Sequence, residues 1–157
     1  MNRAEATCTV KADAQACFGF VAEPSNLPRF MVGIKAHRPQ GKKERGQGAS
    51  FDSVAEVGGR DFETVLVLTE WKEGEKITAT SKSGLKLRAT FVFDEFDDGT
   101  TEVTLVSEYE APGVFRLMGG LVRSAVEEAA EESLQKLKRM VEAEARKGRP
   151  RTPNKAR

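Results

Sequence analysis

The sequence predicts an α+β fold, in which a curved antiparallel sheet of about six or seven strands wraps around one long C-terminal helix. Two patterns support this prediction. Regular turn signals separate short apolar runs over residues 50–110, which is typical of strands joined by hairpins. A helical period then extends from about Val114 to Arg146. Because a single helix laid on a curved sheet can enclose a pocket, we expect a cavity for a small molecule between them.

The N-terminal part of the chain predicts a strand followed by a helical excursion. Residues alternate between apolar and polar from Ala4 to Val10, as in a strand with one buried face. Asp13 can cap the helix that follows. A short second helical segment is predicted at Asn26–Met31 and a return strand at Ile34–Arg38.

Five further strands are predicted as a meander. The small residues that favour tight hairpins occur at Gly58–Gly59, Glu73–Gly74, Ser83–Gly84 and Asp98–Gly99. The apolar runs between them are Phe51–Val57, Phe62–Trp71, Ile77–Ser81, Leu87–Phe96 and Thr101–Glu110. The clean alternation in the last two runs predicts a sheet with one buried face and one wet face.

The long helix has one broad apolar face. Its apolar positions at the helical period are Phe115, Met118, Val122, Ala125, Val126, Ala129, Leu137 and Met140. The pair Gly119–Gly120 interrupts this pattern, and each glycine costs a helix about 1 kcal/mol relative to alanine. The pair has one functional interpretation, a flexible mouth to the cavity, and two structural ones, close packing or a delayed helix start.

Charge is distributed unevenly along the chain. The 157 residues carry 25 basic and 24 acidic side chains, and the length favours one domain, which we expect over residues 1–147. Six of the basic side chains lie in the last twelve residues: Arg146, Lys147, Arg149, Arg151, Lys155 and Arg157. We therefore expect a disordered basic tail over residues 148–157, which either aids solubility or contacts RNA, a ribosome or an anionic membrane surface.

Several classes of function are disfavoured by the motifs that are missing. Cys8 and Cys17 form neither a disulfide framework nor a metal spacing, so a cytoplasmic protein is expected. No apolar run is long enough to span a membrane. His37 is the only histidine, so a Ser/His/Asp triad would have to use it, but the sequence contains no nucleophile-elbow motif. We therefore interpret His37 as a strand or rim residue. We expect no metal and no cofactor, and no catalytic residue is assigned.

The predicted ligand site consists of inward strand positions and the apolar face of the helix. Such a site is mostly apolar with a few polar groups, and we expect the Tyr109 hydroxyl to point into it. The predicted site residues are Phe51, Ser53, Thr64, Leu66, Ser81, Leu87, Ala89, Phe91, Phe93, Leu105, Ser107, Tyr109, Phe115, Met118, Val122 and Val126. Within this set, Phe91, Phe93, Leu105 and the Met118–Val122 turn are expected to surround the ligand.

Several segments carry a family resemblance: Val21–Phe30, Gly59–Arg60, Asp98–Thr104, Tyr109 before Pro112–Gly113, and Leu134–Lys138. With them the chain resembles the START-like (SRPBCC) superfamily, in particular polyketide cyclase/dehydrase-type and coenzyme Q-binding proteins, over residues 4–145. The resemblance implies the helix-grip (Bet v 1-like) fold, with a cavity that binds a lipid or other hydrophobic ligand. It supplies no catalytic signature.

These observations lead to three hypotheses about function. The first is a carrier or sensor that binds a hydrophobic or aromatic small molecule in the cavity. The second is a cyclase or dehydratase acting on a polyketide-like chain, since cavity shape and a few polar groups can catalyse by orientation. The third is a surface-binding module that uses the basic tail. Lys, Arg, Asp and Glu are scarce on the predicted inward faces, which favours binding over catalysis.

Overall fold

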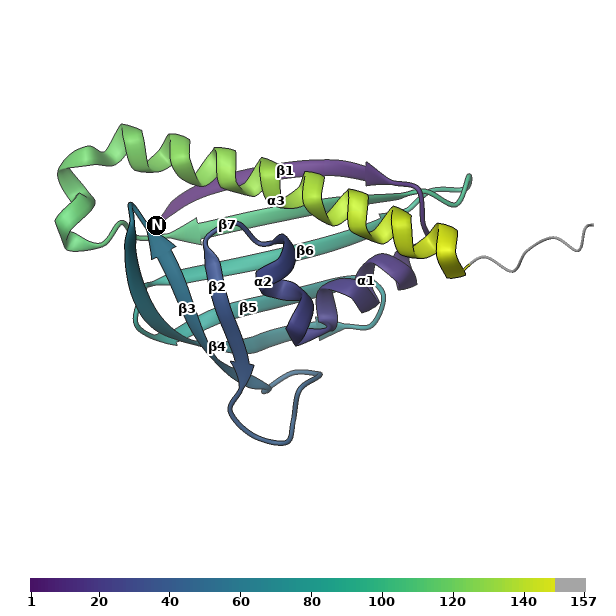
Figure 1. Ribbon diagram of the computed structural model, residues 1–157, viewed down its shortest axis with the longest axis horizontal. Coiled ribbons are helices and arrows are strands. Elements are labelled where there is room, and N and C mark those ends of the chain that lie inside the picture. The colour runs from purple at the N-terminus through teal and green to yellow at the C-terminus, as the bar shows by residue number, and fades with distance from the viewer. Residues whose placement is uncertain (149–157) are drawn as a thin grey trace, which may run out of the picture.

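The computed structural model describes residues 1–148, which form one seven-stranded antiparallel sheet with the helices gathered on one of its faces (Figure 1). The strands are β1 (Asn2–Val10), β2 (Ile34–Pro39), β3 (Ser50–Val57), β4 (Arg60–Lys72), β5 (Lys76–Ser83), β6 (Leu87–Glu95) and β7 (Thr101–Tyr109). The helices are α1 (Ala14–Ala22), α2 (Leu27–Phe30) and α3 (Gly119–Gly148), with 3-10 turns η1 (Pro24–Asn26) and η2 (Gly113–Met118). The predicted fold class is confirmed.

The strand order is β1-β7-β6-β5-β4-β3-β2, so the first strand closes the sheet beside the last one. In β1, β3, β4 and β7 the buried residues fall at every second position, as expected of strands with one face turned toward the helices. In β1 the buried side chains are the small residues Ala4, Ala6, Cys8 and Val10. These short side chains allow α3 to come close enough for the Cys8 thiol to donate to the Leu134 carbonyl, at 3.7 Å.

The core lies where α1 and α2 pack between the sheet and α3. Phe18 on α1 meets Phe93 edge-on with ring centroids 5.5 Å apart. Phe30 on α2 meets Phe91 in the same way at 6.0 Å. These aromatic rings are large and fully or almost fully buried, so they supply much of the apolar area that stabilises the fold.

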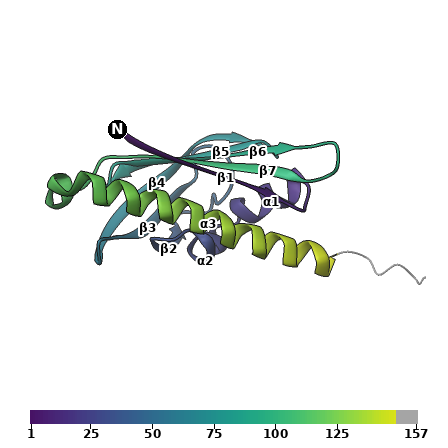
Figure 2. The same ribbon diagram turned by 90° about the horizontal axis from the view of Figure 1, so that it is seen from above.

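Only the second half of α3 is packed into this core. Its buried residues are Ala130, Ser133, Leu134, Leu137 and Val141. At 1.5 Å per residue the 30-residue helix is about 45 Å long. Figures 1 and 2 show α1 and α2 beside its later turns, while its first turns extend past them. The space beneath the first turns is therefore not filled by another helix.

The start of the long helix differs from the prediction. The α-helix begins at Gly119, and the residues predicted as its first turn, from Val114 to Met118, lie in the 3-10 turn η2. Two consecutive glycines are poor helix formers, and they account for the late start. This outcome agrees with the interpretation of a delayed helix start.

The later part of α3 is held by a small polar cluster. Lys138 donates from Nζ to the Thr9 carbonyl at 2.6 Å and to Glu142 Oε2 at 2.8 Å. Glu142 also accepts a hydrogen bond from the Lys11 backbone N–H at 2.8 Å. Burial alone would raise the pKa of Glu142, but the hydrogen bonds from Lys138 and Lys11 outweigh it and lower the pKa. The cluster fixes the helix against the end of β1.

Candidate ligand-binding cavity

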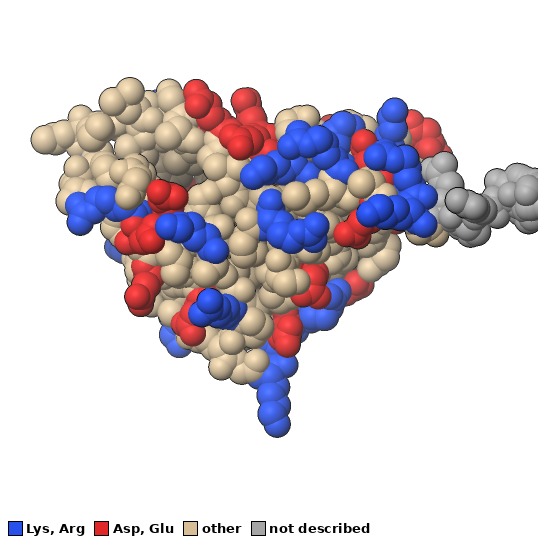
Figure 3. Space-filling model, viewed as in Figure 1, with Lys and Arg blue, Asp and Glu red and all other residues tan. Residues whose placement is uncertain are grey.

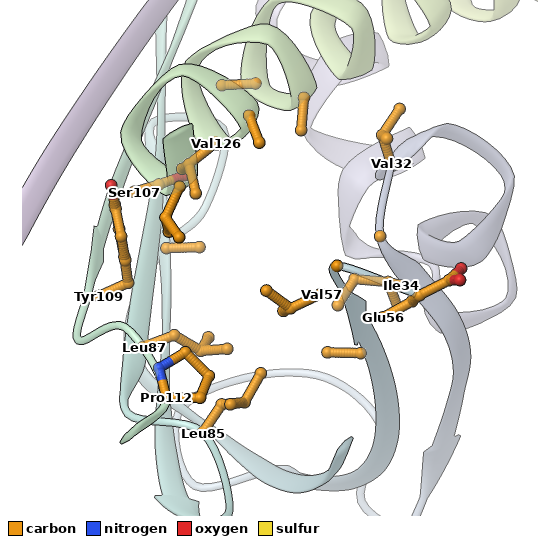
Figure 4. Close-up of a pocket in the computed structure, with 18 of the residues that line it drawn as sticks. Val32, Ile34, Glu56, Val57, Leu85, Leu87, Ser107, Tyr109, Pro112 and Val126 are labelled. Atoms are coloured by element: carbon orange, nitrogen blue, oxygen red, sulfur yellow. The ribbon is translucent and has the colours of Figure 1, made fainter. Parts of the chain in front are cut away.

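A cavity of about 450 Å³ lies beneath η2 and the first half of α3. Its walls come from three parts of the fold (Figure 4). One wall is formed by β6 and β7, the opposite wall by the loop after α2 together with β2 and β3, and the roof by η2 and α3. The short helices α1 and α2 cover only the other end of the sheet (Figure 1). The space remains because neither helix is long enough to extend over this end.

Phe115 of η2 lines the cavity next to the turn between β3 and β4. Its ring stands against Gly58 in the turn between β3 and β4, where a Cβ atom would lie only 2.8 Å from the ring. Gly58 also has a positive φ of 58°, which glycine adopts at little cost. The glycine therefore permits both the hairpin turn and the close approach of the aromatic ring.

The inner walls are apolar because the charged neighbours face outward. Glu56 points away from the cavity (Figure 4). Lys86 and Arg88 alternate with the inward residues of β6, and they pair across the outer face with Glu110 at 3.9 Å and Glu108 at 3.8 Å. Within residues 1–148, no group of three or more His, Cys, Asp or Glu side chains could hold a metal ion.

Among residues 1–148, three hydroxyl-bearing side chains line the cavity. Ser133 of α3 is already occupied: it accepts from the Val32 N–H at 2.9 Å and donates to the Ala129 carbonyl at 2.6 Å. Ser107 and Tyr109 are neighbours on the inward face of β7. Burial raises the pKa of Tyr109, with smaller opposite effects from Arg123 and Glu127. The phenol is therefore protonated near neutral pH.

The mouth of the cavity is rimmed by apolar side chains that face solvent. Leu117 is 102% exposed and Leu121 69%, with Val114 at 60% and Met118 at 45%. Figure 3 shows this end of the molecule as a largely uncharged lobe with a hollow beneath it, whereas the later turns of α3 carry dense charges of both signs. Met118 and Leu121 line the cavity as well as its rim, so the apolar surface is continuous from outside to inside.

Nine of the sixteen predicted site residues line this cavity: Leu87, Ala89, Leu105, Ser107, Tyr109, Phe115, Met118, Val122 and Val126. Phe51, Leu66 and Phe91 lie instead on a separate space of about 80 Å³ beside α1 and α2, which Leu87 and Ala89 also border. His37 lies in β2 at this smaller space, where its Nδ1 is 2.7 Å from Ser53 Oγ.

Four predicted residues lie away from both cavities. Ser53 bonds His37, the Thr64 hydroxyl accepts from the Leu85 N–H at 3.3 Å, and the Ser81 hydroxyl accepts from the Leu87 N–H at 3.0 Å. Phe93 packs on Phe18 in the core. Of the residues predicted to surround the ligand, Leu105, Met118 and Val122 border the larger cavity, whereas Phe91 and Phe93 do not, because they pack against α1 and α2.

The sequence patterns did not predict the wall opposite β6 and β7. That wall is lined by Met31, Val32, Ile34, Ala55 and Val57. Ala55 and Val57 continue the same alternation as Phe51 and Ser53 on β3, so the strand period could have found them. Met31 and Val32 lie in the connection between α2 and β2, which has no period to follow.

Comparison with known proteins agrees with this geometry. A family model described as polyketide cyclase/dehydrase and lipid transport matches residues 1–142. The chain belongs to this family. No curated protein matches the chain. No helix within residues 1–148 is both long enough and apolar enough to cross a membrane.

Solved structures of low sequence identity share the fold of this family member. A Thermus thermophilus protein has 19% identity and a TM-score of 0.78, over 92% of this chain and 99% of that one. A START superfamily protein from Mycobacterium smegmatis has 18% identity and a TM-score of 0.63, over 92% and 97%. The Zhui aromatase/cyclase from Streptomyces has 15% identity and a TM-score of 0.67, over 93% and 94%. These similarities establish the START-like helix-grip fold.

Proposed function

We propose that this protein binds a hydrophobic or aromatic small molecule in the cavity beneath α3, as a carrier or a sensor. The observation that supports the proposal most is the lining: the walls are apolar, and the charged neighbours Lys86, Arg88 and Glu56 face outward. The cavity volume of about 450 Å³ falls within the range of about 300–1,000 Å³ that is usual for ligand pockets. The apolar rim around Leu117 and Leu121 offers an entry path.

A bound ligand would supply packing partners to the apolar walls of the cavity. Space left in a protein interior sacrifices stability, by about 24 cal/mol per Å³ in large-to-small core variants. The cavity opens to solvent, so its cost is smaller than this coefficient gives, but its apolar walls still lack packing partners. A molecule that binds only the folded protein raises the stability as its concentration rises.

The proposal is tested with an uncharged apolar fluorophore, phenylnaphthylamine, and two tryptophan variants of β6. Ala89→Trp fills the cavity wall, whereas Val92→Trp places the same side chain at an exposed position on the other face. We expect A89W to weaken probe binding at least tenfold and to abolish the thermal stabilisation by the probe. V92W should match the wild type. Equal binding by all three proteins would contradict the proposal.

A cyclase or dehydratase is the second candidate, supported by the family description and by the similarity to the Zhui aromatase/cyclase. Such chemistry usually needs a group that transfers protons. Within residues 1–148, Tyr109 is the only ionisable side chain that the strand alternation turns toward the cavity, and its pKa is raised by burial. The cavity therefore favours binding. Turnover of a linear poly-β-ketone thioester by the wild type, lost in Tyr109→Phe, would reverse that preference.

The basic C-terminal tail is not needed for the proposed binding. The third hypothesis, a surface-binding module, uses the basic tail predicted at residues 148–157; Gly148 is the last residue of α3, and residues 149–157 lie outside the described residues. Deleting residues 149–157 should leave fluorophore binding unchanged, and binding that requires them would favour the tail hypothesis.

We also propose a cytoplasmic location, since Cys8 and Cys17 are both free thiols in the interior.

A further inference from the structure

The smaller space of about 80 Å³ between the sheet and the segment from α1 to α2, called the inner space from here on, lies directly beside the main cavity. The two spaces share four lining residues: Met31, Ile34, Leu87 and Ala89. One layer of side chains therefore separates them. The inner space has several times the volume of about 10–15 Å³ that one water-sized group needs, so it can hold the end of a chain-like ligand.

The floor between the two spaces consists of small side chains. Ser107 of β7 pairs in register with Ala89 of β6, and Ala89 pairs in register with Ala79 of β5. Ser107 lines the main cavity, Ala89 lines both spaces and Ala79 lines the inner space. The inward face of the sheet is therefore shallow along the line that joins the main cavity to the inner space.

Large side chains flank this floor on both sides. The inward row on one side is paired across the same three strands and is almost fully buried: Leu105, Phe91 and Ile77. The inward row on the other side contains Tyr109 and Leu87, which face each other across β7 and β6. The small residues therefore form the floor of a narrow channel that runs across the strands.

Met31 is the most adaptable part of the layer between the two spaces. It lies in the connection between α2 and β2, is half-buried and borders both spaces. A Met side chain is unbranched and has three rotatable bonds, so it adjusts to irregular gaps. Ile34, which also borders both spaces, is branched at Cβ and stiffer. A change in the Met31 rotamer widens the channel without a movement of the backbone.

The inner space suits an apolar chain end. Among its lining residues in the described part of the chain, only His37 and Trp71 have side chains that carry nitrogen or oxygen. His37 Nδ1 lies 2.7 Å from Ser53 Oγ, and Trp71 Nε1 donates to Glu73 Oε1 at 3.1 Å. Burial lowers the pKa of His37, so its imidazole is neutral near pH 7. A polar group of a ligand keeps its hydration at the open mouth but loses it in the inner space, at a free-energy cost.

We propose that the main cavity and the inner space form one ligand site, joined across Ala89 and Ala79, and that the ligand carries an unbranched apolar chain whose free end lies beside Trp71. This inference rests on the proposed function and specifies its ligand. The flanking rows keep the channel narrow, so it accepts a chain and excludes a fused ring system. The rest of the ligand occupies the main cavity, with its polar group toward the mouth.

The test uses two isomeric probes, 12-bromododecan-1-ol and 2-bromododecan-1-ol, with the full-length protein. Bromine quenches tryptophan fluorescence only at short range, and Trp71 is the one tryptophan of the chain. Ser107 and Ala79 are two strand spacings apart, about 10 Å, which a dodecyl chain can cross. Displacement of phenylnaphthylamine measures binding. At saturation we expect the 12-bromo isomer to reduce the Trp71 emission at least twofold and the 2-bromo isomer to leave it unchanged.

Two leucine variants of β5 test the path of the chain. Ala79→Leu fills the inner space, whereas Lys82→Leu places the same side chain at an exposed position of the same strand. A79L should abolish quenching by the 12-bromo isomer and weaken its binding about tenfold, because the burial of about two methylene groups is lost. Phenylnaphthylamine should bind A79L as it binds the wild type, and K82L should match the wild type throughout. If A79L does not fold, Ala79→Val, which adds less volume, takes its place.

The remaining outcomes separate the two proposals. If the 12-bromo isomer displaces phenylnaphthylamine without quenching Trp71 in the wild type, the chain does not reach the inner space, and the inference is wrong while the apolar site stands. The inference is also wrong if both isomers quench equally, if quenching persists in the Ala79 variant, or if phenylnaphthylamine binds and neither isomer displaces it. If phenylnaphthylamine itself does not bind, the proposed function fails and this inference fails with it.

Discussion

The hydroxyl of Ser133 on α3 accepts a hydrogen bond from the backbone N–H of Val32 at 2.9 Å. This bond joins the long helix to the loop between α2 and β2, and both residues line the cavity. It lies at the boundary between the packed second half of α3 and the first half that covers the cavity. The bond therefore fixes the point from which the first half of the helix extends over the cavity.

Removing this bond should destabilise the fold. We expect Ser133→Ala to lower the free energy of unfolding by about 1–3 kcal/mol, because the Val32 N–H is left without its partner in a half-buried position. Urea denaturation monitored at Trp71 measures the loss. Ser124→Ala is the control, since Ser124 is an exposed position on the same helix. Equal stabilities for the two variants would show that the bond contributes nothing.

Alanine variants of two turn glycines should distinguish the stability cost of backbone strain from that of steric contact. Gly84 and Gly99 have nearly the same φ, 84° and 85°. A Cβ at Gly84 would collide with the Glu63 carbonyl and the Thr64 backbone, whereas nothing lies within 4 Å of one at Gly99. Gly99→Ala should cost about 1–2 kcal/mol for the left-handed conformation alone. Gly84→Ala should cost about 1–3 kcal/mol more.

Thermal and urea denaturation of the two alanine variants measure this difference. The conformational penalty is common to both sites, so the excess at Gly84 reports the close approach of the β5–β6 turn to β4. If the two variants lose the same stability, the turn does not approach β4 as the structure shows.

His37 should make the stability depend on pH. Burial lowers the pKa of His37 from 6.5 to about 4, and its ring stacks on Phe51 with centroids 4.3 Å apart. The unfolded chain binds a proton below about pH 6.5, while the folded protein binds it only below about pH 4. The contribution of His37 to the free energy of unfolding is therefore complete above pH 6.5. It falls by up to about 3 kcal/mol as the pH is lowered toward 4.

His37→Gln isolates this effect, because the amide can still bond Ser53 but does not titrate in this range. We expect the free energy of unfolding to fall less steeply between pH 7 and pH 4 in the variant than in the wild type. Carboxylates such as Glu70 and Glu142, whose pKa values are lowered, titrate in both proteins and cancel in the comparison. Parallel pH profiles would contradict the prediction.

The sequence predicted the sheet well because alternation and turn glycines are local signals. It placed Leu87, Ala89, Phe91 and Phe93 on one face of β6, which is where they lie. The same period could not say which pair faces the cavity, since all four positions are equivalent in a strand pattern. Only the placement of α1 and α2, a tertiary feature, assigns Phe91 and Phe93 to the core and Leu87 and Ala89 to the wall of the main cavity.

Buried hydroxyl groups are the second case in which the predicted site residues differ from those that line the cavity. Thr64 and Ser81 are inward or half-buried as predicted, yet their hydroxyls accept hydrogen bonds from the backbone N–H groups of Leu85 and Leu87. Those donors belong to residues at or just after the β5–β6 turn, and the geometry of the turn decides the pairing. A strand pattern does not carry that information, so it cannot distinguish a structural hydroxyl from one that is open to a ligand.

The glycine pair at the start of α3 should control how fast a ligand leaves. Gly119 and Gly120 are exposed, and an added Cβ would meet nothing within 4 Å at either position. Packing therefore does not require glycine here, and their effect is to weaken the helix that roofs the cavity, by about 1 kcal/mol each relative to alanine. Replacing both with alanine should rigidify the roof, protect the amides of residues 121–126 from hydrogen exchange, and slow probe release severalfold.

Stopped-flow displacement of phenylnaphthylamine measures the release rate, with Gly148→Ala as the control. Gly148 ends the same helix and is equally free of neighbours, but it lies about 40 Å away along the axis. Its substitution should leave release unchanged. If the double alanine variant gains exchange protection at residues 121–126 but releases the probe at the wild-type rate, the ligand does not pass beneath the start of α3. Because Met118 and Leu121 rim the mouth on either side of this pair, we expect slower release in the double variant alone.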